Sequence, residues 1–443
     1  FMAYNGGATT GSIDTIKVED GWSDVLLGFL GGMDKFGMTI SSPIWGYMLQ
    51  FYEAKILVSG GLFVNACFTL VFATTRNKSL MLFAKFMMGL TEGLQWLWSQ
   101  LWVVSKTGGY PLFLLLNGVS AGLGNVVGTA VSGFSTANGI GYAFAFKVEG
   151  FVLLAFFCFL LCQSTNSLTV KGANVLVKTT SGNATSNSTR KSLKTVLFML
   201  LRNKVYICTA LVFALDNFVN LGIQFLWKRL FMSVWKVDAN DATSSLLLVP
   251  VLGSLAGGAV GASWAFGTQA KAKSALLKCT VAAFVAVVAA VLGWLGIFLE
   301  IAGDKSTRAE HSISWYSSST LGLTYLGFGL AFGGFAAKNG AIQGICTDCI
   351  PDSNDRNISV GMQQALNNFV GYTLAPLVPQ IVMSWSKTWL DIHTEDEHTL
   401  DPPLVFLAGT TATLCATAIV FYLCLSAYRA FKVDTEKLSQ PFF

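Results

Sequence analysis

The stretch Val281-Ala-Ala-Phe-Val-Ala-Val-Val-Ala-Ala-Val-Leu-Gly-Trp-Leu-Gly-Ile-Phe-Leu299 contains no charged residue. It is the centre of an apolar run over 275–300, and about 20 such residues in a helix cross the hydrocarbon core of a bilayer. Ten further runs lie near 24–50, 56–74, 79–104, 109–134, 142–162, 203–227, 244–266, 315–346, 358–383 and 404–427. The sequence therefore predicts an all-α membrane protein that crosses the bilayer many times.

The composition of the whole chain agrees with this interpretation. Of its 443 residues, 53% are hydrophobic and only 12% are charged, with a mean hydropathy of +0.56. A soluble protein carries about 25% charged residues. These values exclude cytosolic enzymes, nucleic-acid binders and disulfide-rich secreted domains. No phosphate-binding glycine loop, nucleotide signature or catalytic triad is visible, and all three histidines fall in polar connecting segments. We therefore expect no enzymatic activity, no cofactor, no metal site and no nucleic-acid partner.

Residues Phe1–Ser12 are also apolar and small, but as a helix they would reach only ~18 Å. We interpret them as the end of a first span whose beginning is missing from this sequence, with residues 13–23 as the loop that follows. Together with the eleven runs this gives twelve spans, arranged as two six-helix bundles.

One long polar connection divides the chain into 1–162, a flexible linker at 163–202, and 203–443 with a short cytoplasmic tail. The linker is rich in Ser, Thr, Asn and Gly. Between Gln163 and Lys204 lie seven basic residues and no acidic one. Because positive loops stay on the cytoplasmic side, we place the linker there. Six plus six spans around such a linker is the design of many secondary transporters.

Charged side chains inside the spans identify candidate site residues, because each costs ~2.5–3.5 kcal/mol to insert. Lys85 and Glu92 are seven residues apart, so they share one helix face, ~10 Å apart along the axis. Gln95 continues the same stripe. We interpret Glu92 as a substrate-headgroup or proton site. The alternative is a buried residue that only packs the helix.

The second half carries a comparable stripe. Asp216 and Asn220 have four-residue spacing in the span at 203–227, and Gln364 and Asn367 lie in the span at 358–383. Amides of this kind can simply bridge helices, at about 0.6 kcal/mol each. Stripes in both halves, however, are what a central polar site requires. We expect Lys338 to extend its ammonium to the membrane surface.

Glycines at four-residue spacing give two spans a smooth face. They occur in the spans at 109–134 and 244–266, and include Gly124, Gly128, Gly253, Gly257 and Gly261. Such faces permit close helix approach, and we expect these two spans to pack or slide against each other.

Two segments resemble a known family. Ser42–Lys55, SPIWGYMLQFYEAK, is similar to the P-[VI]-[FW]-G-Y-L-x-D-R-[YF]-x-R-K pattern of the spinster-like branch of the major facilitator superfamily. Ala84–Gly93, AKFMMGLTEG, resembles the A-R-x-x-x-G-x-x-E-A pattern of the same branch. The resemblance implies a transporter of two six-helix bundles and, for this branch, a lysolipid, sphingoid lipid or similar amphiphile as substrate.

The sequence also departs from the family pattern. Gln50, Phe51 and Ala54 stand where the family has charged residues that clamp the cytoplasmic ends of the two halves. Asn5 aligns loosely with the acidic position of the family's first-span signature, and Gly6 with its basic position. We therefore predict no ionic lock between residues 46–55 and the eleventh span, and we include Asn5 among the candidate substrate- or proton-binding residues.

The sequence thus predicts a secondary active transporter that moves an amphiphilic or small organic substrate by alternating access, with proton coupling as an option. Its partners would be membrane lipids and the small-molecule or lipid substrate. The alternative is a non-transporting, major-facilitator-like subunit of a larger membrane complex, which the altered clamp and Asn5 favour.

Overall fold

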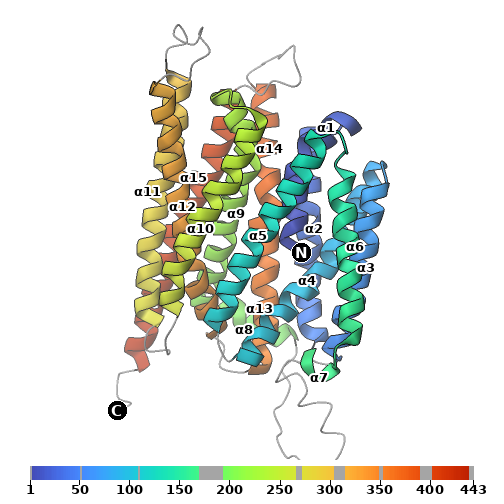
Figure 1. Ribbon diagram of the computed structural model, residues 1–443. Helices are drawn as coiled ribbons and strands as arrows, with labels where there is room; N and C mark the ends of the chain where they lie inside the picture. The colour runs from blue at the N-terminus through green and yellow to red at the C-terminus, as the bar shows by residue number, and fades with distance from the viewer. Residues whose placement is uncertain are drawn as a thin grey trace, which may run out of the picture.

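The computed structural model describes residues 2–49, 52–107, 110–168, 193–265, 272–303, 315–348, 353–389 and 402–438. Within these residues the regular structure is entirely helical (Figure 1). Seven of the helices are long and apolar enough to cross a membrane. The protein is a multi-pass integral membrane protein, as the sequence predicts.

The N-terminal half consists of six long helices: α1 (Met2–Asp20), α2 (Asp24–Met48), α3 (Ala54–Thr74), α4 (Lys78–Thr107), α5 (Tyr110–Ala137) and α6 (Ala143–Cys162). The expected loop at 13–23 is wrong for most of its length, since α1 continues to Asp20. The physical reason is that Ile13 and Ile16 on this extension are buried in the core of the half.

The C-terminal half has six long helical segments as well. They are α9 (Lys204–Val234), α10 (Ala239–Ala265), α11 (Ala272–Ala302), α12 (Trp315–Asp348), the run of α13 (Ser353–Leu366), π-helix η5 (Asn367–Thr373) and α14 (Leu374–Trp389), and α15 (Pro402–Leu438). All eleven predicted apolar runs are therefore helical in their described parts. Two short helices, α7 (Thr165–Leu168) and α8 (Leu193–Arg202), occupy the ends of the expected linker, and residues 169–192 lie outside the described part.

The two halves lie side by side, blue to teal and green to red in Figure 1. Helices α7 and α8 and the red end of α15 lie at the same end of the molecule, which we call the linker end. At the opposite end Arg76 pairs with Glu19 and Asp20, each at 3.0 Å, and Tyr142 donates to Asp20 at 2.8 Å. These contacts tie α1 to the α3–α4 turn and to α6.

The core of the C-terminal half is built around Trp227. Its ring stacks on Phe231 with centroids 4.6 Å apart and on Tyr325 at 6.2 Å, which joins α9 to α12. Trp294 meets Phe328 edge to face and donates to Thr413 at 2.9 Å, so α11 and α15 are held to the same centre.

The glycine faces do not form the interface that the sequence suggests. Gly253, Gly257 and Gly261 of α10 lie against the backbone of α12, and Gly124 and Gly128 of α5 lie against α1. Each pair belongs to one half. The two spans contact each other as expected, but not through these glycine faces, because each face packs against a helix of its own bundle. The α5–α10 contact between the halves is a smaller one.

The principal seam between the halves runs along α2. Near the linker end a Cβ at Gly361 would lie 3.0 Å from the Ser42 carbonyl oxygen, and further along Gly32 lies against Thr373 of η5. At the opposite end Gly28 lies against Leu377 of α14. One helix of the N-terminal half therefore follows the whole α13–η5–α14 run.

Two neighbouring glycines test the close packing of α10 on α12. A Cβ at Gly257 would overlap the carbonyl group of Gly333, whereas Gly258 has open space around its Cα. We predict that Gly257→Ala lowers stability by about 1–3 kcal/mol through overpacking, and that Gly258→Ala leaves it unchanged. Thermal unfolding of both variants in the same detergent measures the difference. Equal melting temperatures would contradict the α10–α12 contact.

Candidate functional site

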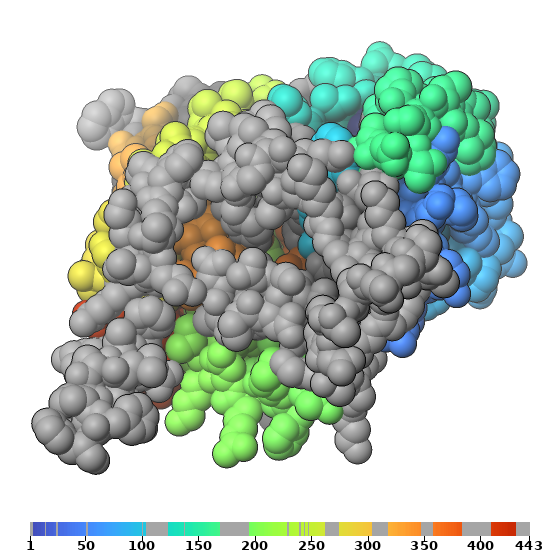
Figure 2. Space-filling model, turned by 90° about the horizontal axis from the view of Figure 1, so that it is seen from below, coloured from blue at the N-terminus to red at the C-terminus, as the bar shows by residue number. Residues whose placement is uncertain are grey.

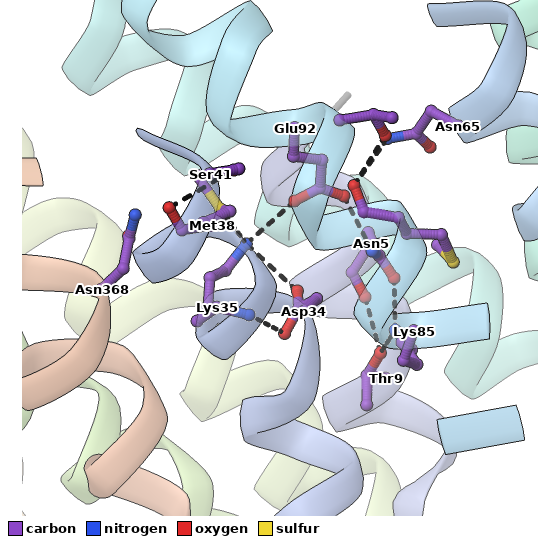
Figure 3. A network of polar contacts seen from close by, with 12 residues as sticks. Asn5, Thr9, Asp34, Lys35, Met38, Ser41, Asn65, Lys85, Glu92 and Asn368 are labelled. Atoms are coloured by element: carbon purple, nitrogen blue, oxygen red, sulfur yellow. Dashed lines mark hydrogen bonds and ion pairs between the residues drawn. The ribbon is translucent and has the colours of Figure 1, made fainter. Parts of the chain in front are cut away.

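A buried polar network joins three helices in the N-terminal half (Figure 3). Glu92 of α4 accepts a hydrogen bond from Asn5 Nδ2 of α1 at 3.0 Å and one from Lys35 Nζ of α2 at 3.2 Å. Lys35 also pairs with Asp34 at 3.1 Å. Only 2% of Glu92 is exposed. Both carboxylate oxygens of Glu92 are thus occupied.

Lys85 lies on the other side of Asn5. Its ammonium donates to Asn5 Oδ1 at 2.5 Å and to Thr9 Oγ1 at 2.6 Å. The rings of Phe72 and Phe146 lie over it, each with its centroid 5.0 Å from Nζ. The structure therefore connects the predicted residues Glu92 and Lys85 through the predicted residue Asn5, whose amide donates to the acid and accepts from the base.

The C-terminal half contains a different buried charge pair. Asp216 Oδ1 lies 2.9 Å from Lys338 Nζ, and both side chains are fully buried. The pair joins α9 to α12, with Lys338 Nζ 4.5 Å from the Phe335 ring centroid. The prediction that Lys338 extends to the membrane surface is wrong, because the ammonium finds a carboxylate inside the bundle instead.

The neighbouring face of α9 carries the amides that meet the seam. Asn217 donates to Asn367 of η5 at 2.8 Å and accepts from Tyr372 at 3.2 Å. Asn220 accepts from Gln224 at 2.6 Å, and Gln224 in turn accepts from Asn125 of α5 at 3.3 Å, which links the two halves.

The predicted residue Gln364 donates to Asn368 at 3.2 Å, which joins α13 to the start of η5. We call these three separate groups of hydrogen-bonded amides, which include Asn220, Gln364 and Asn367, the polar seam. Asp216, by contrast, pairs with Lys338 inside its own bundle. Gln95 is 9% exposed, and its Nε2 has no hydrogen-bond partner.

Sequence reasoning missed several of these residues as site members. Lys35 is not among the predicted site residues, although an ammonium in the middle of an apolar span can reach a carboxylate of the next helix. Asn217 directly follows the predicted Asp216, and Asn368 directly follows the predicted Asn367. The π-helix that turns Asn367 and Asn368 to different partners leaves no simple sequence pattern. Outside this network, Glu149 of α6 is 3% exposed, and its signal in the sequence is an acid in a run that is otherwise apolar except for Lys147.

The seam near the linker end is apolar where the family pattern has an ionic clamp. Leu49, Val58, Leu94 and Leu97 of the N-terminal half enclose Val360 of α13. Lys55 Nζ donates to the carbonyl oxygens of Leu161 and Gln163, at 2.9 and 2.6 Å, within its own half. Gln50 and Phe51, two of the three altered clamp positions, lie outside the described residues.

Figure 2 shows the molecule from the linker end, where orange atoms of the C-terminal half and cyan atoms of the N-terminal half are both visible in the centre of the view. In the described residues no group of three or more His, Cys, Asp and Glu side chains is placed to hold a metal ion.

Comparison with known proteins identifies the fold. No protein-family model and no curated protein matches the sequence. Among solved structures, a bacterial homologue of the human lysosomal transporter Spinster, in an inward-facing and unoccupied conformation, has a TM-score of 0.56 at 16% identity, over 98% of this chain and 96% of its own. The proton:xylose symporter XylE gives 0.64 at 12% identity, over 97% and 94%.

The human organic anion transporter TETRAN gives a TM-score of 0.55 at 16% identity, over 94% of this chain and 89% of its own. The chain therefore has the major facilitator fold, a bundle of two six-helix halves. The expected fold class is confirmed, and a Spinster homologue is among the structures that share this fold.

The Asp216–Lys338 pair gives a stability prediction. Removing one partner leaves a buried charge without compensation, which costs about 3–5 kcal/mol, whereas replacing both is close to neutral. We predict that Lys338→Met strongly lowers the melting temperature in detergent, and that adding Asp216→Leu restores most of the loss. A double variant no more stable than the single one would show that the pair is not coupled.

Proposed function

We propose that this protein is a secondary transporter that moves a small organic or amphiphilic substrate by alternating access of its two halves. Residues 1–162 and 203–443 would be the moving bodies, joined by a cytoplasmic linker at 163–202. The observation that carries the proposal is the polar seam, where charged groups of the N-terminal half face amides of the C-terminal half in the middle of a membrane protein. Buried polar groups at such a depth mark substrate and ion pathways.

The N-terminal side of the site is the pair Lys35–Glu92, with Asn5 and Asp34 around it. Gly32, one turn before Lys35 on α2, lies against Thr373 of η5, so the network is next to the seam. In Figure 3 the side chain of Asn368 lies on the opposite side of Lys35 from Asn5. A substrate between the halves would contact Lys35 on one side and η5 on the other.

Unused hydrogen-bond donors indicate the chemistry of the ligand. The amide nitrogens of Gln95, Gln363 and Asn368 are buried and have no hydrogen-bond partner. A buried donor without an acceptor costs about 1–3 kcal/mol, so these groups favour a ligand that brings acceptor oxygens. Hydroxyl, carbonyl and phosphate groups of a lysolipid or sphingoid lipid supply them. A sugar supplies them too.

Proton coupling is part of the proposal. The N-terminal network holds several carboxylates out of water, and moving a charge between partners as the halves rock would link access to protonation. The proton:xylose symporter among the similar structures has proton coupling in its name, which is consistent with this fold supporting such a cycle.

Glu92 gives the first test. Wild-type protein in proteoliposomes is assayed for uptake of lysolipids, sphingoid bases, sugars and organic anions. Glu92→Gln leaves Lys35 without its α4 carboxylate, so we expect uptake of the transported compound to fall at least about tenfold, equivalent to about 1.4 kcal/mol. Glu53→Gln, an exposed acid before α3, is the matched control and should keep the wild-type rate.

The outcomes distinguish a functional from a packing role of Glu92, and a transporter from a non-transporting protein. Wild-type uptake that persists in Glu92→Gln would make Glu92 a packing residue. No uptake of any compound by the wild type would favour a non-transporting subunit of a larger membrane complex.

The seam gives a second test, of alternating access itself. A Cβ at Gly361 would lie 3.4 Å from Pro43 Cα, so cysteines at 43 and 361 lie within disulfide reach. In a background without the nine native cysteines, oxidation of Pro43→Cys/Gly361→Cys should stop transport and a reductant should restore it. The two single-cysteine variants are the controls. Full transport by the cross-linked protein would rule out opening of this seam.

A further inference from the structure

Glu149 is a buried carboxyl group that the site described above does not use. It lies in the middle of α6 with 3% of its surface exposed, and its Oε2 has no hydrogen-bond partner. An ionised carboxylate in such a place is far more costly than a neutral one. The group therefore needs either a proton or a cation.

The nearest buried cation is Lys85 of α4. Its ammonium lies over the ring of Phe146, which is one turn before Glu149 on α6. It is nevertheless bound by two neutral oxygen atoms, those of Asn5 and Thr9 on α1, and by aromatic faces. Among the described residues, Lys85 and Glu149 are thus a buried base and a buried acid for which no ion pair is present, on helices that lie around one aromatic ring.

The other charged groups of the network are already matched. Lys35 contacts both Asp34 and Glu92, so the cluster holds two lysines and three acids, and Glu149 is the acid left over. Around α6, helix α1 contributes Tyr4, which donates to the Ala145 carbonyl at 3.1 Å. Helix α5 has no ionisable residue except Tyr110 at its start, and in α3 the charged residue is Lys55, bound at the far end of α6.

We propose that Glu149 is the proton-binding site of the N-terminal half, and that Lys85 is the switch that empties it. While Asn5 and Thr9 bind Lys85, Glu149 carries one proton and is neutral. When Lys85 leaves α1 and turns to α6, the carboxyl releases that proton to water and forms an ion pair with the ammonium. Lys85 keeps its charge throughout, so one proton leaves for each switch.

The movement of Lys85 would affect the seam between the halves through Asn5. Its oxygen binds Lys85 and its nitrogen binds Glu92, which binds Lys35 of α2. Departure of Lys85 frees the Asn5 amide and changes the surroundings of the Lys35–Glu92 pair. The inference rests on the proposed transport function and places its proton on α6, away from that pair.

Infrared difference spectroscopy tests this without any substrate. Full-length protein in phosphatidylcholine nanodiscs is titrated between about pH 5 and about pH 9, a range that covers strongly shifted carboxyl groups. We expect the C=O band of a protonated buried carboxyl at the acidic end, and its loss at the basic end. The band should be missing in Glu149→Gln, present in Glu149→Asp, and unchanged in the exposed control Glu53→Gln.

Lys85→Met tests the switch. Without the ammonium the ionised carboxylate has no partner, so the band should persist at every pH in the range. A band that survives in Glu149→Gln, a wild-type band that never titrates, or a Lys85→Met titration like that of the wild type would each overturn the proposal. Failure of wild-type proteoliposomes to take up any compound would contradict the transport function alone, because the spectra need no transport.

Discussion

Asn5 is the point on which the N-terminal half depends. In hydrocarbon no water is present to solvate a charge, so every buried ion must find its partner inside the protein. The side-chain amide of Asn5 supplies a partner to an acid and to a base at once. Its nitrogen donates to Glu92, and its oxygen accepts from Lys85. Helices α1 and α4 are joined there, and Lys35 adds α2. The aromatic rings of Phe72 and Phe146 enclose the ammonium from α3 and α6.

The two halves meet the same constraint in different ways. The C-terminal half joins Asp216 directly to Lys338, with no amide between them, and keeps the pair inside its bundle. The side chains that it presents to the seam are neutral amides, among them Asn217, Asn220 and Asn367. The N-terminal half keeps its charges next to the seam. A ligand between the halves would therefore contact charged side chains of the N-terminal half on one side and amide side chains of the C-terminal half on the other.

Sequence alone predicts those features that follow from the hydrophobicity of a segment and from the 3.6-residue period of a helix. Apolar length gives the spans, and seven-residue spacing places Lys85 and Glu92 on one face. Partners on distant helices are beyond such reasoning. Nothing near Lys338 in the sequence indicates Asp216, so surface exposure was the wrong expectation for a lysine in an apolar run. Likewise, four-residue glycine spacing indicates that α10 has a smooth face, but whether α5 or α12 fills it depends on three-dimensional packing.

The π-helix η5 has a consequence for how α13 and α14 face α2. Each turn of a π-helix takes up more residues than an α-turn, so the two flanking helices are out of phase with a continuous α-helical register. Since one residue corresponds to about 100° of helix rotation, this change of phase decides which sides of α13 and α14 meet their neighbour. Both Gly361 and Leu377 lie against α2 as a result. Helix α2 therefore packs against sides of α13 and α14 that one continuous α-helix would not bring to the same face.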